Sequence, residues 1–243
     1  MAALHLYLDL MSQPCRSVYI FARANNIAFQ YEAVRLFKGE HITDEFKNVN
    51  AFRKVPALKD GEFTLSESTA IILYLARKFN TPDHWYPSDL QKRARVDEYL
   101  AWQHTNTRPH GSKIFWGKHM AKVLTGEELC PEKLNPLLVQ FSNILTDLEK
   151  VFLQDTPFLV GNEISIADLV AIVELMQAVA AGLNFFDDRP KLDAWKQRVV
   201  AAVGEELFNE AHKEILSVQE HSKDSIPPQL LEGLKEKLEL ITK

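Results

Sequence analysis

A serine near the amino terminus stands where a side chain can hold an anion. Ser12 and Cys15 form an S-x-x-C pattern between an apolar run and an amphipathic segment. The free amides and dipole at a helix start favour negative charge, so a serine hydroxyl there can either cap the helix or donate to a bound anion. A thioredoxin-type reductase has C-x-x-C at this place, and its first cysteine is the attacking thiol. This sequence has serine at that first position, so the attacking thiol is absent. Cys15 is expected to be a small buried hydrophobic residue.

A second group of candidates surrounds a proline and a helix start. In Lys54-Val55-Pro56 the proline enters an expected strand. It is either an ordinary strand-start proline or a cis bond that turns the Val55 backbone toward an incoming peptide. Glu67-Ser68 opens the next helix, where the serine and the helix amides could hold a carboxylate and Glu67 an ammonium group. A helix cap is the alternative for this pair.

The remaining candidates are isolated along the chain. His41 lies in a polar loop, where a histidine is either simply solvated or a ligand. Arg108, Trp116 and Met120 are spaced eight and four residues apart and would share one face of a continuous helix. That face is either core or one wall of a ligand pocket, and the arginine would favour an anionic substrate. The sequence has no H-E-x-x-H, P-loop, G-x-G-x-x-G or G-x-S-x-G motif, so no metal or nucleotide site is predicted.

The hydrophobic pattern predicts the elements that must position these residues. Up to residue 80 the order is β-α-β-α-β-β-α, over residues 4–9, 14–25, 29–36, 43–48, 57–59, 63–65 and 66–79. Asp60-Gly61 between two apolar runs predicts a hairpin. The first unit needs a crossover, so a parallel pair is expected to join an antiparallel hairpin. Residues 81–88, with two prolines and no helical period, are the predicted linker.

From residue 89 onward the chain predicts helices. They are expected over 91–123 (one long helix or a kinked pair), 132–154, 165–182, 190–203, 207–219 and 228–241, with a turn at 222–227. Ser165 and Asp168 stand in S-x-x-D spacing before an apolar run, which predicts a capping box. We therefore assign Asp168 to structure rather than catalysis. The predicted fold class is an α/β amino-terminal domain followed by an all-α domain.

Composition limits the classes of protein and partner. The 243 residues are 46% hydrophobic and 25% charged, as in an ordinary globular protein. A net charge of −5 argues against a nucleic-acid partner or an anionic membrane surface. No uncharged apolar run reaches membrane-spanning length. Two cysteines cannot build a disulfide framework or a four-thiolate zinc site, and no signal peptide is visible, so a cytoplasmic protein is expected.

Together these segments resemble the cytosolic glutathione transferases, and their theta class most closely, over nearly the whole chain. The resemblance rests on LYLDLMSQPCR (6–16), KGEHITDEF (38–46), KVPALKDGEFTLSES (54–68), ARVDEYLAWQH (94–104) and FLVGNEISIADLVAIVELM (158–176). Serine after the first strand points to theta rather than to the tyrosine-using classes. The resemblance implies a thioredoxin-like glutathione-binding domain over residues 1–80, the linker 81–88, and an all-helical domain over 89–243 that forms the electrophile site.

The resemblance also implies a role for each candidate. Ser12 would be the catalytic residue, donating its hydroxyl hydrogen to the glutathione thiolate, and Tyr7 is expected to be structural. The residues that would bind glutathione are Gln13, His41, Lys54, Val55, Glu67 and Ser68. The second substrate would meet the C-terminal helix and the residues Met11, Arg108, Trp116, Met120 and Gln177.

The implied activity is conjugation of glutathione to alkyl and arylalkyl halides, dihalomethanes and epoxides in xenobiotic detoxification, with organic hydroperoxide reduction as a further activity. Glutathione would be a co-substrate, with no metal or redox cofactor, and the protein would be a homodimer. Two alternatives stay open. One is a non-catalytic binding or scaffold protein of the same fold. The other is a glutathione-dependent disulfide reductase, which requires a nucleophilic cysteine at position 12.

Overall fold

The first part of the molecule is built around a four-stranded sheet. The computed structural model describes residues 3–220, 223 and 226–241. The strand order is β2-β1-β3-β4, with β1 and β2 parallel and the other two pairs antiparallel. The strands are β1 (Leu4–Leu8), β2 (Gln30–Ala33), β3 (Ala57–Asp60) and β4 (Phe63–Ser66). The predicted combination of a parallel pair with an antiparallel hairpin is confirmed.

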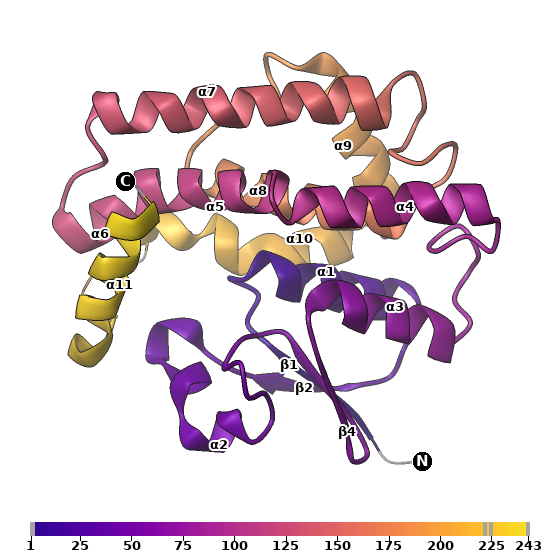
Figure 1. Ribbon diagram of the computed structural model, residues 1–243, viewed down its shortest axis with the longest axis horizontal. Coiled ribbons are helices and arrows are strands. Elements are labelled where there is room, and N and C mark those ends of the chain that lie inside the picture. Colours follow the sequence, from indigo (N-terminus) through magenta and orange to yellow (C-terminus); the bar gives the residue numbers. More distant parts are fainter. Residues whose placement is uncertain (1–2, 221–222, 224–225, 242–243) are drawn as a thin grey trace.

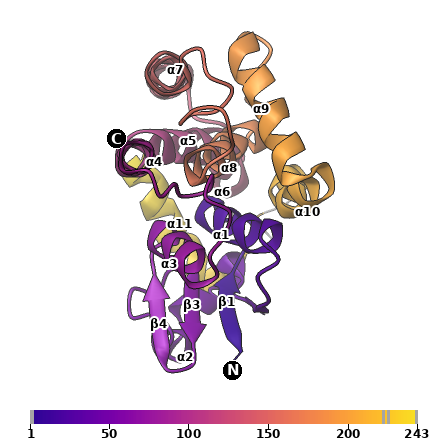
Figure 2. The same ribbon diagram turned by 90° about the vertical axis from the view of Figure 1, so that its right-hand side faces the viewer.

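Three helices cover the two faces of this sheet. Helices α1 (Gln13–Ala24) and α3 (Ser68–Lys78) lie between the sheet and the helical domain, whereas α2 (Asp44–Lys47) lies on the far side (Figure 1, Figure 2). Strand alternation sorts the side chains between these faces. Leu6 and Leu8 of β1 are fully buried. Tyr7 points the other way, and its ring meets Phe46 of α2 edge-on at 6.0 Å between centroids.

The hairpin between β3 and β4 has a two-residue turn. Asp60 pairs with Phe63, so the turn consists of Gly61 and Glu62. Gly61 has a φ of 62°, which glycine adopts at no steric cost and which suits the first position of a tight hairpin turn. The hairpin is where the sequence predicts it, but Asp60 is a strand residue rather than a turn residue.

The second part of the molecule is helical. Its helices are α4 (Leu90–Gln103), α5 (Thr107–Phe115), α6 (Ala121–Thr125), α7 (Pro131–Asp147), α8 (Ile166–Ala180), α9 (Pro190–Val203), α10 (Glu205–Leu216) and α11 (Pro228–Ile241). Helix α8 is central: it packs against α1, α4, α5, α9 and α10, and all its residues except Val179 are buried. Helix α11 packs apart from this bundle, beside α6 (Figure 1).

Two of the long predicted helices contain interruptions. The helix expected over 91–123 is a kinked pair, because α4 ends at Gln103 and α5 begins at Thr107. A π-helical turn over Trp116–Met120 then separates α5 from α6, and a second over Leu148–Leu153 follows α7. A π turn holds more residues than an α turn, so it rotates the side chains that follow it. The turn predicted at 222–227 lies largely outside the described residues.

The predicted capping box at the start of α8 is confirmed. Asp168 is fully buried, and its carboxylate accepts hydrogen bonds from Ser165 N and Oγ, Leu159 N and Trp195 Nε1, all at 2.8–3.0 Å. Burying a carboxylate is tolerable only when its oxygens are well satisfied, as they are here. Asp168 therefore ties the start of α8 to α9 and to the preceding loop.

Buried His212 of α10 predicts an acid-sensitive fold. Burial, aided by the nearby Arg16 charge, lowers its pKa to about 3, against about 6.5 in an unfolded chain. Between these values the unfolded chain binds a proton that the native state does not. Stability therefore falls as pH decreases, by about 1.4 kcal/mol per pH unit. We expect wild type to lose about 2 kcal/mol more than His212→Phe between pH 8 and pH 5 in urea unfolding.

The comparison at pH 8, where the histidine is neutral in both states, isolates the packing cost of the substitution. Equal losses in the two proteins between pH 8 and pH 5 would contradict this account of His212.

Candidate active site

The strand register brings three candidate segments to one edge of the sheet. Antiparallel β3 pairs with both β1 and β4, so the carboxyl ends of β1 and β4 flank the amino end of β3. Ser12 follows β1, Val55 precedes β3 and Glu67 follows β4. A ligand at this edge meets all three segments, although they are far apart in sequence.

Ser12 occupies the N-cap position of α1, but its side chain caps no backbone amide. The backbone amides of Cys15 and Arg16 already donate to the Ser12 carbonyl at 3.1 Å, and Pro14 has no N–H. Within the described part of the chain, the Gln13 N–H is the donor of this turn that has no acceptor. The Ser12 hydroxyl and the Gln13 amide are therefore available to a ligand.

Cys15 lies one turn into α1 and is fully buried, as predicted. Burial raises the pKa of its thiol to about 12, and the nearby Ser12 hydroxyl only partly offsets this effect. Thiolate is the nucleophilic form of cysteine, so Cys15 is almost wholly unreactive at neutral pH. Tyr7 lies away from Ser12, in a separate hollow with Phe46 and Glu32, as expected for a structural tyrosine.

The segments at the starts of β3 and α3 have unusual backbones. The Val55–Pro56 bond is cis, which is the second of the two possibilities that the sequence left open. Glu67, the N-cap residue of α3, has a φ of 70°, and its side chain caps no amide. A non-glycine residue in this region is strained, and such strain persists where the surroundings over-determine the conformation, often at ligand sites. Glu67 is exposed, whereas the adjacent Ser68 is buried.

A cavity of about 260 Å³ opens beside Ser12, between the sheet edge and the helical domain. It is lined by Met11, Ser12, Gln13, Leu36, Phe37, His41, Ser112, Phe115, Trp116, Met120, Gln177, Leu234 and Lys237. Seven of the predicted site residues are among them. Lys54, Val55, Glu67, Ser68 and Arg108 are outside this lining.

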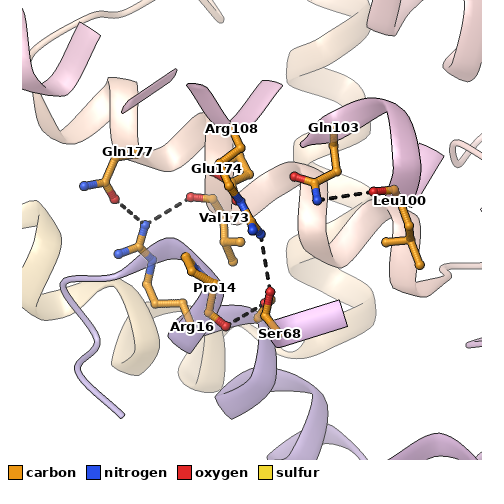
Figure 3. Close-up of polar contacts among 10 residues, drawn as sticks. Pro14, Arg16, Ser68, Leu100, Gln103, Arg108, Val173, Glu174 and Gln177 are labelled. Carbon is orange, nitrogen blue, oxygen red and sulfur yellow. Dashed lines mark hydrogen bonds and ion pairs between the residues drawn. The ribbon is translucent and has the colours of Figure 1, made fainter. Parts of the chain in front are cut away.

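Arg108 lies outside the cavity lining that includes Trp116 and Met120. Its Nε donates to Glu174 Oε1 at 2.8 Å, and its Nη2 contacts Ser68 Oγ at 3.4 Å (Figure 3). Glu174 is fully buried in α8, where burial raises the pKa of its carboxyl and the Arg108 charge opposes the rise. A buried carboxylate needs a cation, which directs Arg108 toward Glu174. The π-helical turn begins at Trp116, so the phase of α5 is not continued through Met120.

Sequence reasoning missed six lining residues: Leu36, Phe37, Ser112, Phe115, Leu234 and Lys237. Ser112 and Phe115 are neighbours of Trp116 on α5, so helical spacing could have found them. Leu234 and Lys237 belong to α11, and nothing local in the sequence says where that helix docks. The Lys237 ammonium lies 4.5 Å from the centre of the Trp116 ring.

Charges are close together at one end of the cavity. Partial removal from water lowers the pKa of Lys237, and the Lys54 charge lowers it further. Burial, together with the Lys237 charge, lowers the pKa of His41. Like charges repel, so this end of the cavity favours an anionic group.

The sheet domain is thioredoxin-like and a helical domain lies on top of it. At their junction, the Ser12 hydroxyl caps no backbone amide and borders the cavity. This arrangement is that of the glutathione transferases. Two family models match: the glutathione S-transferase N-terminal domain over residues 6–83 and the C-terminal domain over residues 109–202.

Relatives match over their full length. Mouse glutathione S-transferase theta-3 is 55% identical over 237 residues, which are 98% of this chain and 96% of that protein. The apo structure of human glutathione S-transferase T1-1 has a TM-score of 0.94 and 52% identity, covering 99% of this chain and 100% of that one. A crystal structure of human glutathione transferase theta-2 with glutathione and an unknown ligand has a TM-score of 0.92 and 44% identity, covering 98% and 100%.

The chain belongs to the glutathione S-transferase family, within its theta class. It is an enzyme with glutathione as its co-substrate. Within the described ranges, no group of three or more His, Cys, Asp and Glu residues is arranged to hold a metal ion. The helices of that same part of the chain include none with the length and hydropathy to cross a membrane.

The two cysteines are expected to differ sharply in reactivity. Cys130 is exposed, whereas a pKa of about 12 leaves Cys15 only about one part in 10⁴ to 10⁵ as thiolate near pH 7.4. Iodoacetamide should therefore alkylate Cys130 and leave Cys15 unmodified in the native protein, as read by peptide mass spectrometry. Cys130→Ser should abolish the fast reaction. Rapid labelling of Cys15 in that variant would contradict the burial argument.

Proposed function

We propose that this enzyme joins the glutathione thiolate to small electrophiles by displacement or addition, and that Ser12 stabilises the thiolate. The observation that carries the proposal is the Ser12 hydroxyl, which stands at the start of α1, caps no amide and borders the cavity. The thiolate attacks the electrophile directly, with no covalent enzyme intermediate. The protein contributes charge stabilisation and positioning.

The energetic requirement matches what this site offers. A free thiol has a pKa near 8.5, and lowering it by about two units needs about 2.7 kcal/mol of preferential thiolate stabilisation. One hydrogen bond to a charged group contributes about 1.5–3 kcal/mol. The Ser12 hydroxyl supplies one such bond, and the free Gln13 amide is placed to supply another.

The segments around Ser12 suit the rest of glutathione. We assign the backbone of Val55 to the cysteinyl unit, and Glu67 with Ser68 to the γ-glutamyl ammonium and carboxylate. Their common position at the sheet edge supports this assignment. Lys54 and His41 are assigned to the glycyl carboxylate, supported by the crowded positive charge at that end of the cavity.

The second substrate would lie against Met11, Trp116, Met120 and Gln177, which line the cavity. Thioether and indole surfaces are polarizable and apolar, which suits halogen-bearing carbon centres. We therefore propose alkyl and arylalkyl halides, dihalomethanes and epoxides as substrates, with organic hydroperoxides as further ones. Arg108 is not part of this proposed wall, because its guanidinium is committed to Glu174.

We further propose that the enzyme is a homodimer that detoxifies xenobiotics in the cytoplasm. Exposed Phe52, Phe63 and Leu90 provide apolar surface for a second copy. Neither cysteine is in a disulfide, which suits a reducing compartment. Of the two alternatives, the disulfide reductase is disfavoured by the inert Cys15 thiol. Whether the protein is instead a non-catalytic scaffold is decided by measuring whether wild type turns over an electrophile.

The test is glutathione-dependent halide release from a small alkyl halide by wild type and Ser12→Ala. We expect the variant to fold and to bind glutathione within about twofold of wild type, because the hydroxyl faces the thiol alone. The pKa of the bound thiol should rise by about one to two units, and kcat near pH 7 should fall about tenfold to a hundredfold.

Ser17→Ala is the matched control, since Ser17 lies one turn further along α1 and donates to Pro14 O at 2.9 Å, away from the cavity. It should turn over like wild type. Undiminished turnover by Ser12→Ala would remove Ser12 from the mechanism. Glutathione binding without turnover of any electrophile class by wild type would favour the scaffold.

A further inference from the structure

Arg16 of α1 is a fully buried cation that no carboxylate contacts within ion-pair distance in the described part of the chain. Its guanidinium donates to backbone and amide oxygens instead. Nη1 donates to Leu10 O at 2.7 Å and to Met11 O at 3.1 Å. Nη2 donates to Val173 O at 3.0 Å and to Gln177 Oε1 at 2.7 Å. The planar fork thus joins two separate parts of the chain.

The first part is the turn that carries Ser12, and it is held on both sides. Its carbonyls, on Leu10 and Met11, are held by Arg16. Its amides are held by Asp9, because Met11 N donates to Asp9 Oδ1 and Ser12 N donates to Asp9 O, both at 2.9 Å. With both peptide faces bonded, the backbone that enters Ser12 has little freedom.

The second part is helix α8, the buried centre of the helical domain. Figure 3 shows the Arg16 guanidinium directed at Gln177 and the Val173 carbonyl on this helix. Gln177 also lines the cavity. One amide side chain therefore borders the electrophile site while its oxygen holds the arginine that fixes the Ser12 turn.

We propose that Arg16 is a positioning residue for the transfer reaction: it anchors the Ser12 turn to α8 and so fixes the Ser12 hydroxyl relative to the bound sulfur. The inference rests on the proposed function of Ser12. Hydrogen-bond stabilisation of a thiolate is sensitive to donor placement, and a displacement of about 1 Å can cost up to about a hundredfold in rate. Through this arginine, the helical domain thus contributes to thiolate stabilisation without a contact to glutathione.

The charge of Arg16 is a separate effect that the test must exclude. Burial lowers the pKa of Arg16 to about 10, so it stays protonated near neutral pH. The titratable groups that face it are Glu174 on α8, Cys15 on α1, Asp9 after β1, and Glu214 and His212 on α10. Arg16→Lys keeps the positive charge but loses the fork. Gln177→Leu keeps Arg16 and removes one of its four acceptors.

The experiment measures the pKa of the thiol in bound glutathione, from the pH dependence of its ultraviolet thiolate absorbance, with no electrophile present. We expect Arg16→Lys to raise this pKa by about half to one unit, and Gln177→Leu to raise it by less. Glutathione affinity should stay within about twofold, so the loss appears in kcat rather than in KM for glutathione.

A double-mutant cycle with Ser12→Ala identifies the route. If Arg16 acts through Ser12, neither substitution shifts the thiol pKa further once the hydroxyl is gone. Equal shifts in both backgrounds would mean that Arg16 affects the thiolate by a route that does not pass through Ser12, which overturns the positioning role. If Ser12→Ala raises the thiol pKa but neither positioning variant does, this inference fails and the proposed function stands. No shift with Ser12→Ala itself overturns the proposed function.

Arg198 gives the matched control. Its Nε donates to Pro157 O at 2.9 Å, so it also ties a helix to a loop carbonyl, but on α9 and outside the cavity lining. Arg198→Lys should lower the melting temperature at most, with the thiol pKa unchanged. If Arg16→Lys fails to fold, Gln177→Leu, which leaves three of the four bonds, decides the question by the same criteria.

Discussion

The site depends on one constraint, the antiparallel pairing of β3 with both of its neighbours. Because β3 runs against β1 and β4, its amino end meets their carboxyl ends at a single edge of the sheet. Each of the three chain segments at that edge brings a different group: a hydroxyl at Ser12 and a carboxylate at Glu67, neither of which caps its helix, and the backbone at Val55 beside the cis bond. A tripeptide that crosses the edge can therefore meet all three without movement of the chain.

Helix α8 is both the centre of the hydrophobic core of the helical domain and the element whose buried polar side chains orient its neighbours. Two carboxylates lie within this almost wholly buried helix, and each is tied to a different neighbour. Asp168 accepts from the loop before the helix and from α9, while Glu174 binds Arg108 of α5. Buried polar groups left without partners are costly, so these contacts define the orientation of α8 against its neighbours. The same orientation presents Gln177 and the Val173 carbonyl to Arg16.

Local signals predicted most of the fold, because they depend on a few neighbouring residues. The hairpin at Gly61 and the capping box at Asp168 both follow from turn and cap chemistry. The Ser12 turn was also predicted, although only the structure shows that the Ser12 side chain does not cap α1.

What the sequence did not predict depends on contacts distant in the chain. The partner of Arg108, Glu174, is 66 residues away in the chain, so local spacing gave no sign of this ion pair. The contribution of α11 to the cavity was expected only in general terms. The docking of its residues Leu234 and Lys237 is decided by packing against the π-helical turn rather than by their own sequence.

The proposed role of Ser12, rather than Tyr7, agrees with the two-residue period of β1. Leu6 and Leu8 face the layer of α1 and α3, so Tyr7 between them must face α2, where it packs on Phe46. A one-residue register shift of β1 would turn Tyr7 toward the α1 and α3 face of the sheet. It would also move Leu6 and Leu8 out of the buried core, which is energetically unfavourable. The first hydroxyl that can turn toward the α1 terminus therefore belongs to a residue beyond the end of the strand. Ser12 is that residue, and since it is a turn residue its position depends on side-chain bonds such as those of Asp9 and Arg16 rather than on the sheet.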